Sequence, residues 1–370
     1  MPSDSTSEPI IRVGLIGCGE VAQVAHIPTF NFLSSKFTIT YLCDISLQSL
    51  EFCAGRVAGS NRPKTTQDAR EVCSSSEVDA VFVCSSDAVH TLHGFLALQH
   101  DKHVLIEKPL ALCQRDINEL VEAEKKSKGR VFVGYMRRYA SAFKDAVNEI
   151  GGIEGIQYVK VRDIICQNSV FINQSATFPQ KFTDISSKAA EEFLEREKSM
   201  IHEALSVDMG LEVTDQRTTM LRLLGGLGSH DLSAMREIIG MPKRVLGARV
   251  QLPMWQVLFD YGNFTAVYES GFNSVPYFDA SIEVFKENKI VTVKYDTPYV
   301  KGLPTTMAVR ERVGEIAYQE RVLRTTYEDP YTKEILEWYE CIIGNKVPKT
   351  TAEDARADLE IIKMILQAEN

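Results

Sequence analysis

Several features that mark other classes of protein are missing from this sequence of 370 residues. No apolar stretch approaches the ~20 residues that a membrane-spanning helix needs. Lysine and arginine are not clustered, and the formal net charge of −9 disfavours binding to a nucleic-acid backbone. The first nine residues are polar and lack the apolar core of a signal peptide, so we expect residues 1–9 to be a frayed tail and the protein to be cytoplasmic.

Cysteine is present, but not with the spacing of a metal or redox site. The eight cysteines form no Cys-x-x-Cys pair, and several lie in apolar runs, so free thiols in a reducing cytosol are predicted. His90 and His93, like His100 and His103, have no quartet of acids or thiols around them, so no metal site is expected. Gly-x-Ser-x-Gly elbows and Walker-type phosphate loops are also absent.

What the sequence does contain is a glycine-rich turn suited to a dinucleotide. An apolar run, residues 11–16, precedes Gly-Cys-Gly-Glu-Val-Ala and a segment that can start a helix. Gly17 permits the tight turn, Gly19 leaves out the Cβ that would block a pyrophosphate, and Ala22 lets helix and strand pack closely. The phosphates would lie at the helix N-terminus. The expected cofactor contacts in this loop are Gly17, Gly19, Glu20 and Val21.

A second apolar run, residues 38–43, ends at Asp44. In a mononucleotide-binding fold a carboxylate at this place accepts the ribose hydroxyls. It also repels a 2′-phosphate, and neither Ile45 nor Ser46 offers an arginine to offset the repulsion, so NAD is favoured over NADP. The alternative interpretation of Asp44 is a helix cap or a loop acid.

The first half of the chain alternates apolar runs with helical patterns, which predicts an α/β domain with a doubly wound parallel sheet of Rossmann type. Further strands are expected over residues 78–84, 104–106 and 131–134, and helices over residues 89–99 and 141–150. The carboxyl ends of such strands form the ligand crevice. Ser85 and Ser86 follow the strand 78–84 and are therefore expected to contact the cofactor.

Beyond residues 151–152, which are both glycine, the pattern changes to short strands joined by tight turns. The expected strands cover residues 156–162, 245–251, 256–261, 264–270, 281–287 and 290–294. They predict a C-terminal α+β domain with an open, mainly antiparallel sheet, through which we expect a homodimer or homotetramer to form. An amphipathic helix over residues 352–366 is expected to pack back on the body.

These patterns predict a nucleotide-binding domain over residues 10–135, a substrate and oligomerisation domain over residues 136–350, and a C-terminal helix within residues 351–370. A long connection, residues 163–224, separates the first two strands of the second domain and has a helical pattern over residues 188–205. Long ordered connections are usually lids, binding elements or subunit contacts. We expect residues 166–224 of this connection to line the substrate side of the cleft, in their own subunit or a neighbouring one; the alternative is an oligomer interface alone.

The most informative motif is Glu107-Lys108-Pro109, directly after the expected strand 104–106. Taken alone, a lysine after a strand is normally a solvated charge. In a chain that opens with a dinucleotide-binding loop, this lysine could reach a nicotinamide, which points to hydride-transfer chemistry. For acid–base work its pKa must fall from about 10.4 toward 7 or 8, and burial beside a cationic ring favours that fall.

Four segments together resemble the Gfo/Idh/MocA oxidoreductase family, and the resemblance covers nearly the whole chain. They are the glycine-rich loop 17–22, the run 103–109, the segment 134–139, which is similar to that of inositol dehydrogenases, and the helix start 228–232. Members typically pair a Rossmann domain with an open-sheet domain and bind NAD or NADP. They oxidise or reduce a hydroxyl of a sugar, polyol or related compound between the two domains.

The resemblance implies roles for residues in these segments. Lys108 and His230 would be catalytic residues at the reacting carbon, with Lys108 as proton donor or acceptor and His230 as hydrogen-bond partner of the reacting oxygen. Glu107 would support the cofactor, and His90 would lie beside it. The remaining candidates are Arg137 for the cofactor and Tyr135, Arg138 and His230 for the substrate.

One position departs from the sugar-oxidising relatives, in which an aspartate usually stands one helical turn before the histidine. Here that position is Gly226, so His230 loses the expected carboxylate partner. The departure argues against a lysine–aspartate–histidine proton relay and against a simple polyol substrate, and we expect free monosaccharides to be poor substrates. The alternative interpretation of His230 is a helix-start residue with ordinary hydrogen bonds.

The combined prediction is an NAD(P)-dependent oxidoreductase that transfers a hydride between nicotinamide and a hydroxyl or carbonyl carbon of a sugar-like, polyol or secondary-metabolite substrate. The fold also hosts redox-neutral isomerases, epimerases and lyases that keep NAD bound, and cofactor-sensing regulators without turnover. Because function lives in the site, the fold alone does not choose among these three classes.

Overall fold

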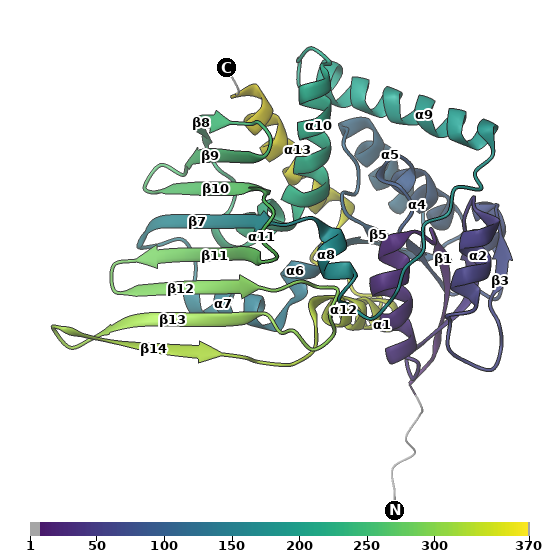
Figure 1. Ribbon diagram of the computed structural model, residues 1–370, viewed down its shortest axis with the longest axis horizontal. Helices are drawn as coiled ribbons and strands as arrows, with labels where there is room; N and C mark the ends of the chain where they lie inside the picture. The colour runs from purple at the N-terminus through teal and green to yellow at the C-terminus, as the bar shows by residue number, and fades with distance from the viewer. Residues whose placement is uncertain (1–7, 369–370) are drawn as a thin grey trace, which may run out of the picture.

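Two sheets lie next to each other in the computed structural model, which describes residues 8–368 (Figure 1). The first has six strands in the order β3-β2-β1-β4-β5-β6, and the second has eight in the order β14-β13-β12-β11-β7-β10-β9-β8. Most of the tail expected over residues 1–9 lies outside the described residues. Within residues 8–368, no helix combines the length and the apolar character that a bilayer crossing requires.

The first sheet confirms the predicted doubly wound fold, because all its strands are parallel and the order reverses between β1 and β4. Its strands are β1 Ile11–Ile16, β2 Phe37–Cys43, β3 Lys64–Thr66, β4 Ala80–Val83, β5 His103–Glu107 and β6 Val131–Gly134. The connecting helices are α1 Ile27–Phe32, α2 Leu47–Ala54, α3 Ala69–Ser74, α4 His90–Gln99 and α5 Gln114–Glu124. The two faces bury separate apolar cores, one with α1 and α2 and the other with α3, α4 and α5.

A helix from the far end of the chain completes one of these cores. This helix, α12 Pro330–Gly344, falls within the range predicted for the second domain, yet it packs on the first sheet. Its Trp338 stacks on Phe37 of β2, with ring centroids 5.7 Å apart and planes inclined by 12°. The predicted boundary at residue 350 therefore does not follow the packing, because residues distant in sequence share one core.

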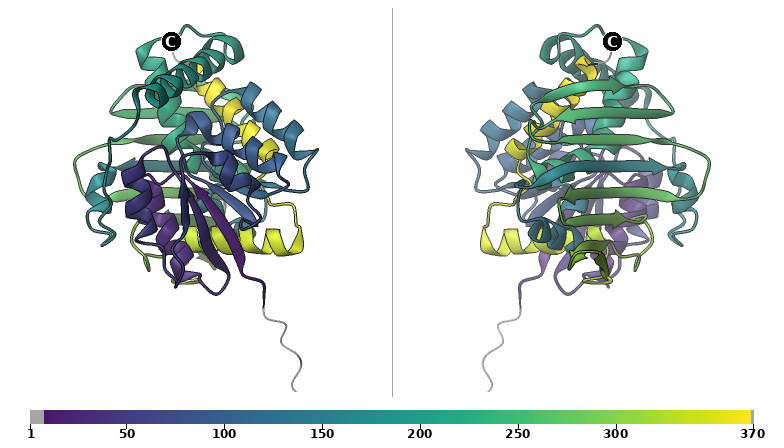
Figure 2. Two further views of the ribbon diagram at one scale, coloured as in Figure 1. Left: turned by 90° about the vertical axis from the view of Figure 1, so that its right-hand side faces the viewer. Right: turned by 90° about the vertical axis from the view of Figure 1, so that its left-hand side faces the viewer.

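The second sheet is the open, mainly antiparallel sheet that the sequence predicts; only β10 and β7 pair in parallel. Its strands are β7 Ile156–Ile165, β8 Arg244–Arg249, β9 Met254–Asp260, β10 Thr265–Phe272, β11 Phe278–Lys286, β12 Lys289–Tyr295, β13 Thr306–Val313 and β14 Ala317–Leu323. The helices α7 Ser141–Ile150, α11 Ser229–Ile239 and α13 Ala352–Gln367 pack on one face (Figure 2). The other face stays free of helices in the right-hand view of Figure 2.

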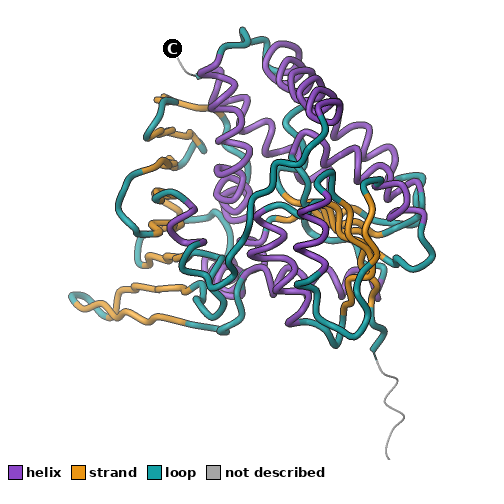
Figure 3. Tube along the Cα trace, turned by 45° about the vertical axis from the view of Figure 1, so that its right-hand side comes forward, coloured by secondary structure: helices purple, strands orange, loops and turns teal. Residues whose placement is uncertain are grey.

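The long connection between β7 and β8 contains several helices joined by an extended segment. It includes α8 Asn168–Ile172, α9 Ser187–His202 and α10 Asp215–Leu223, and a π-helical turn, Leu224–Gly228, leads directly into α11. The helix expected over residues 188–205 corresponds to α9. Between α8 and α9, residues 173–186 run as a loop along the first domain (Figure 3).

Candidate functional site

A cavity of about 730 Å³ opens at the carboxyl ends of β1, β2 and β4, where the order of the first sheet reverses. Parallel sheets of this type bind nucleotides at that place. Of the predicted cofactor residues, the cavity is lined by Gly17, Gly19, Glu20, Val21, Asp44, Ser85 and Ser86. The structure thus brings together residues that lie up to about 70 positions apart in the sequence, in the arrangement of a dinucleotide site.

The glycine-rich loop has the shape that a bound pyrophosphate requires. Gly17 has φ +104°, and a Cβ there would meet the backbone of Cys84 at 2.5 Å, so only glycine permits this turn. A Cβ on Gly19 would meet no protein atom within 4 Å, although Gly19 lines the cavity. Its missing side chain therefore leaves space for a ligand, and the loop fits the phosphates of a dinucleotide.

Asp44 lies in the cavity wall with both carboxylate oxygens hydrogen-bonded. Its Oδ2 accepts from the backbone N–H of Cys18 at 2.7 Å, and its Oδ1 accepts from that of Ser46 at 2.8 Å. Burial raises the pKa of Asp44 above its usual value, the charge of Asp184 adds to the rise, and the backbone hydrogen bonds oppose it. Helix α2 is capped by Ser46, whose Oγ accepts from Ser49 at 3.0 Å, so Asp44 is not the cap of that helix.

The two histidines at the start of α4 have different surroundings. His90 is only 2% exposed, and its ring nitrogens lie 2.8 Å from the carbonyl oxygen of Pro109 and 2.9 Å from that of Ser85. It thereby ties together the loops that follow β4 and β5, while its neighbour His93 lines the cavity. The Nδ1 of His93 lies 2.9 Å from the Oγ of Ser85, and burial lowers the pKa of His93 to about 4. The sequence identified only His90 as a residue beside the cofactor.

Glu107 is held by a histidine that the sequence did not identify. Its Oε1 lies 2.7 Å from Nε2 of the fully buried His26, and its Oε2 accepts from the backbone N–H of Lys108 at 3.0 Å. Burial would raise the pKa of Glu107, but the hydrogen bond to His26 and the nearby charges of His26 and Lys108 bring it below its usual value. Glu107 therefore stays ionised beside Lys108 and fixes the backbone from which that side chain extends.

Lys108, His230 and Gly226 come together at the end of β5 and the start of α11. Lys108 donates from Nζ to the carbonyl oxygen of Gly226 at 2.5 Å. Burial and the charge of Arg137 lower the pKa of Lys108, although Glu107 opposes the change. The pKa of His230 is lowered well below its usual value, mainly by burial and further by the positive charges of Lys108 and Arg137. Its imidazole is therefore neutral at physiological pH. Both side chains remain partly exposed to solvent.

Sugar-oxidising relatives usually carry an aspartate at position 226, and here none of the other described side chains takes over its hydrogen bond with Lys108. The carbonyl oxygen of Gly226 accepts from the ammonium instead, in the π-helical turn that precedes α11. Such turns are frequent at functional sites because they widen a helix by one residue. A Cβ on Gly226 would meet no atom within 4 Å, so the turn leaves room for a side chain or a ligand there.

Arg137 is buried between two acids and does not line the nucleotide cavity. Its Nη2 lies 2.9 Å from Oδ2 of Asp163 on β7, and its Nη1 pairs with Asp231 on α11. The guanidinium also lies 4.9 Å from the ring centroid of Tyr295. Burial, and the neighbouring Asp163, raise the pKa of Asp231 well above its usual value. In place of the predicted cofactor contact, we propose that Arg137 positions β7 and α11 relative to each other.

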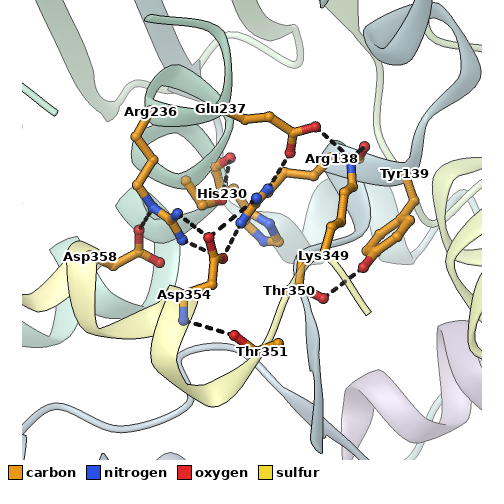
Figure 4. A network of polar contacts seen from close by, with 11 residues as sticks. Arg138, Tyr139, His230, Arg236, Glu237, Lys349, Thr350, Thr351, Asp354 and Asp358 are labelled. Atoms are coloured by element: carbon orange, nitrogen blue, oxygen red, sulfur yellow. Dashed lines mark hydrogen bonds and ion pairs between the residues drawn. The ribbon is translucent and has the colours of Figure 1, made fainter. Parts of the chain in front are cut away.

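The predicted substrate residue Arg138 belongs to a network that joins the two domains (Figure 4), and its guanidinium lies 5.7 Å from the ring centroid of Tyr135, the second predicted substrate residue. Arg138 pairs with Glu237 on α11 and with Asp354 on α13. Arg236 binds the same Asp354, through Nη1 at 2.5 Å and Nη2 at 2.8 Å. Tyr135 and Arg138 are 2% and 4% exposed. Because both are buried among these partners, we propose that they hold α11 in place rather than contact a substrate.

Part of the long connection lies at the nucleotide cavity. Residues 166–224 are expected to line the substrate side of the cleft, in their own subunit or a neighbouring one, and five residues of this segment line the nucleotide cavity of their own chain. They are Ile185, Ala189, Glu192, Phe193 and Arg196. Phe171, in the first part of the connection, packs in one apolar cluster with Leu227. Periodicity located α9, but it could not show on which side of the cleft the helix would lie.

All eight cysteines are free thiols. Within residues 8–368, no group of three or more histidine, cysteine, aspartate or glutamate side chains is arranged to hold a metal ion.

Residues 11–135 match the oxidoreductase family with an NAD-binding Rossmann fold. An inositol 2-dehydrogenase of Saccharopolyspora erythraea is 35% identical over 146 residues, which are 39% of this chain and 42% of that enzyme. An inositol 2-dehydrogenase/D-chiro-inositol 3-dehydrogenase of Shouchella clausii is 36% identical over 136 residues, which are 36% of this chain and 38% of that enzyme. The matched part thus spans about two fifths of the length of these relatives.

Solved structures extend the likeness in fold to nearly the whole chain. A 3-ketoreductase from Actinomadura kijaniata in complex with NADP and TDP-benzene superposes with a TM-score of 0.70 at 15% identity, covering 98% of each chain. A UDP-N-acetylglucosamine 3-dehydrogenase from Acidithiobacillus ferrooxidans gives a TM-score of 0.69 at 15% identity, again over 98% of each chain. At this level of identity the likeness establishes the two-domain fold.

Proposed function

Residues 11–135 belong to the Gfo/Idh/MocA oxidoreductase family, and from this premise we propose that the chain is an NAD(P)-dependent oxidoreductase acting on a hydroxyl or carbonyl carbon of a small organic molecule. One observation carries the proposal: at the end of β5, a strand of the nucleotide-binding sheet, Lys108 donates to the carbonyl oxygen of Gly226, has a lowered pKa and lies close enough to lower the pKa of His230. Perturbed ionisable groups that converge at a cofactor site are typical of acid–base catalysis.

The bound nicotinamide supplies the hydride acceptor or donor. The chain supplies the proton chemistry: in the direction of oxidation, the neutral amine of Lys108 takes the proton of the reacting hydroxyl, and in reduction its ammonium returns one. His230 orients that oxygen with a hydrogen bond, because its Nδ1 is buried without a protein partner among the described residues. The Gly226 carbonyl directs the Lys108 amine, and Glu107 with His26 holds the strand end.

The pH dependence of the reaction should report Lys108. Because its pKa is lowered, the neutral base is present at a lower pH than for a free lysine. For alcohol oxidation, kcat/KM should therefore rise with pH and then level off, and the midpoint of the rise should lie clearly below about 10.4. His230 should add no second rise above pH 6.5, because it is already neutral there. A midpoint at or above that of a free lysine, measured from initial rates across pH, would contradict the assignment.

Gly226→Asp should shift that midpoint upward. The new carboxylate has room, and it would lie one helical turn before His230 and close to the Lys108 amine. A nearby negative charge favours the charged forms, so it raises the pKa of both groups. Gly226→Asn, which has the same size but no charge, is the matched control and should leave the midpoint within experimental error. Equal profiles for the two variants would show that position 226 does not face the catalytic pair.

The substrate class is proposed as sugar-like, polyol or secondary-metabolite compounds. Net formation of NADH would support a dehydrogenase, turnover with unchanged cofactor absorbance would support a redox-neutral isomerase, epimerase or lyase, and partner binding without turnover would support a regulator. The converging Lys108 and His230 argue against the regulator, because a regulator has no need of a general base. We further propose a cytoplasmic location, consistent with the eight free thiols, and a homodimer or homotetramer formed through the open face of the second sheet.

A further inference from the structure

The extended segment of the long connection, residues 173–186, is fastened across the nucleotide side of the first domain, and we call it the strap. Gln23, which follows the glycine-rich loop, exchanges two hydrogen bonds with the backbone of Gln180, at 3.0 and 2.8 Å. Arg56 donates to the carbonyl oxygens of Thr177 and Phe178. The strap is therefore anchored to the turn that precedes α1 and to a residue that follows α2, and Figures 1 and 3 show it running over the first domain.

Asp184 of the strap occupies the N-terminus of α2. Its Oδ2 accepts from the backbone N–H of Gln48 at 3.0 Å, and its Oδ1 accepts from the hydroxyl of Ser46. These groups are the free donors at the start of an eight-residue helix, which is a favourable position for an anion. The carboxylate thus fills the place where a phosphate near this helix would bind.

The ribose side of the cavity lies next to this contact. Ser46 links the two acids, because its backbone N–H donates to Asp44 and its hydroxyl donates to Asp184. Ile185, directly after Asp184, lines the cavity together with Asp44. The only lysine or arginine in the cavity lining is Arg196, and its guanidinium already binds Asp116 and the carbonyl oxygen of Ala88. No free cation in this lining is left to offset the two carboxylates.

We infer that Asp184 is a second specificity-determining residue, which excludes a 2′-phosphorylated dinucleotide by holding the helix donors that the phosphate would need. The inference rests on the proposed binding of NAD(P) at this cavity. Asp44 repels the 2′-phosphate by charge, whereas Asp184 also removes its hydrogen-bond partners. The strap thereby gives the second domain a direct part in the choice of cofactor.

The test is titration calorimetry of the full-length protein with NAD and with NADP. Wild type should bind NAD more tightly than NADP. Asp184→Ala frees the Ser46 and Gln48 donors, so we expect NADP to bind about tenfold more tightly while the Kd for NAD changes less than about threefold. Asp184→Asn removes only the charge and should produce a smaller gain. Glu195→Gln, which makes the same change in net charge on the exposed side of α9, should alter neither affinity.

Gln23→Ala, which removes the side chain that holds the backbone of Gln180, separates specificity from closure of the strap. Losing that anchor should weaken NAD and NADP by the same factor, because both lie under the strap. If Asp184→Ala leaves the ratio of the two dissociation constants unchanged while NAD still binds, the inference is wrong and the proposed function stands. If wild type binds neither nucleotide, the proposed function itself fails. A wild-type preference for NADP would overturn the specificity assigned to both acids.

Discussion

Lys108→Ala should lower turnover by roughly 10²–10⁴-fold, the range typical for loss of a positioned acid or base. The Lys108 amine is the basic group with a lowered pKa that lies beside His230, and its hydrogen bond to the Gly226 carbonyl aims it. Cofactor affinity should change by less than about tenfold, because the glycine-rich loop and Asp44 remain intact. Steady-state rates with the best available substrate and titration with NAD separate the two effects.

Lys126→Ala, on an exposed surface outside the site, is the matched control for this substitution and should retain wild-type rates. His230→Ala should reduce turnover less than Lys108→Ala, because His230 orients the reacting oxygen without carrying the proton. If Lys108→Ala kept the activity of the wild type, a group other than Lys108 would have to transfer the proton. Equal losses of turnover and NAD binding would show that Lys108 serves the cofactor alone.

Arg137→Met should destabilise the fold by about 3–5 kcal/mol, the range found when one partner of a buried ion pair is removed. Asp163 and Asp231 are fully buried, and without the guanidinium neither has a cation. The folded-state pKa of Asp231, which burial already raises, would rise further, so the folded state would bind a proton that the unfolded state has released. The loss of unfolding free energy should therefore be larger at pH 8 than at pH 5.

Denaturant unfolding at both pH values measures this loss, with the exposed Arg70→Met as control. The same variant distinguishes the two roles considered for Arg137. A role in positioning predicts unchanged affinity for NAD under conditions where the variant is folded. A large drop in NAD affinity with unaltered stability would instead support the cofactor contact that the sequence predicted for Arg137.

The parts of the fold that the sequence predicted well are those set by local patterns. The helix Ser141–Ile150 and the strand Val131–Gly134 were placed to the residue, because apolar periodicity and flanking glycines mark their ends. The strand β14 was missed because none of its residues is buried, and β13 was missed because its alternation of buried residues covers only its first half, before a charged stretch. Helix α12 was also missed, although Asp329 caps it and proline begins it.

For the candidate site, position after a strand indicated Gly17, Asp44 and Lys108, and the resemblance to the Gfo/Idh/MocA family implied His230. Side chains that act through tertiary contacts could not be found in this way. His26 reaches Glu107 across 81 positions of sequence, and Asp184 reaches Ser46 across 138. Tyr135 and Arg138 are buried by α11 and α13, so their burial could not be predicted from the sequence of residues 134–139 alone.

The central claim, hydride transfer with Lys108 as the acid–base group, is tested most directly by mixing the protein with NAD and a panel of hydroxyl compounds and following nicotinamide absorbance, for wild type and for Lys108→Ala. The account predicts that wild type forms NADH with at least one compound at a rate that rises with pH, and that Lys108→Ala forms it at least about 100-fold more slowly. Conversion of a compound with no net change in absorbance, or equal NADH formation by both proteins, would contradict it.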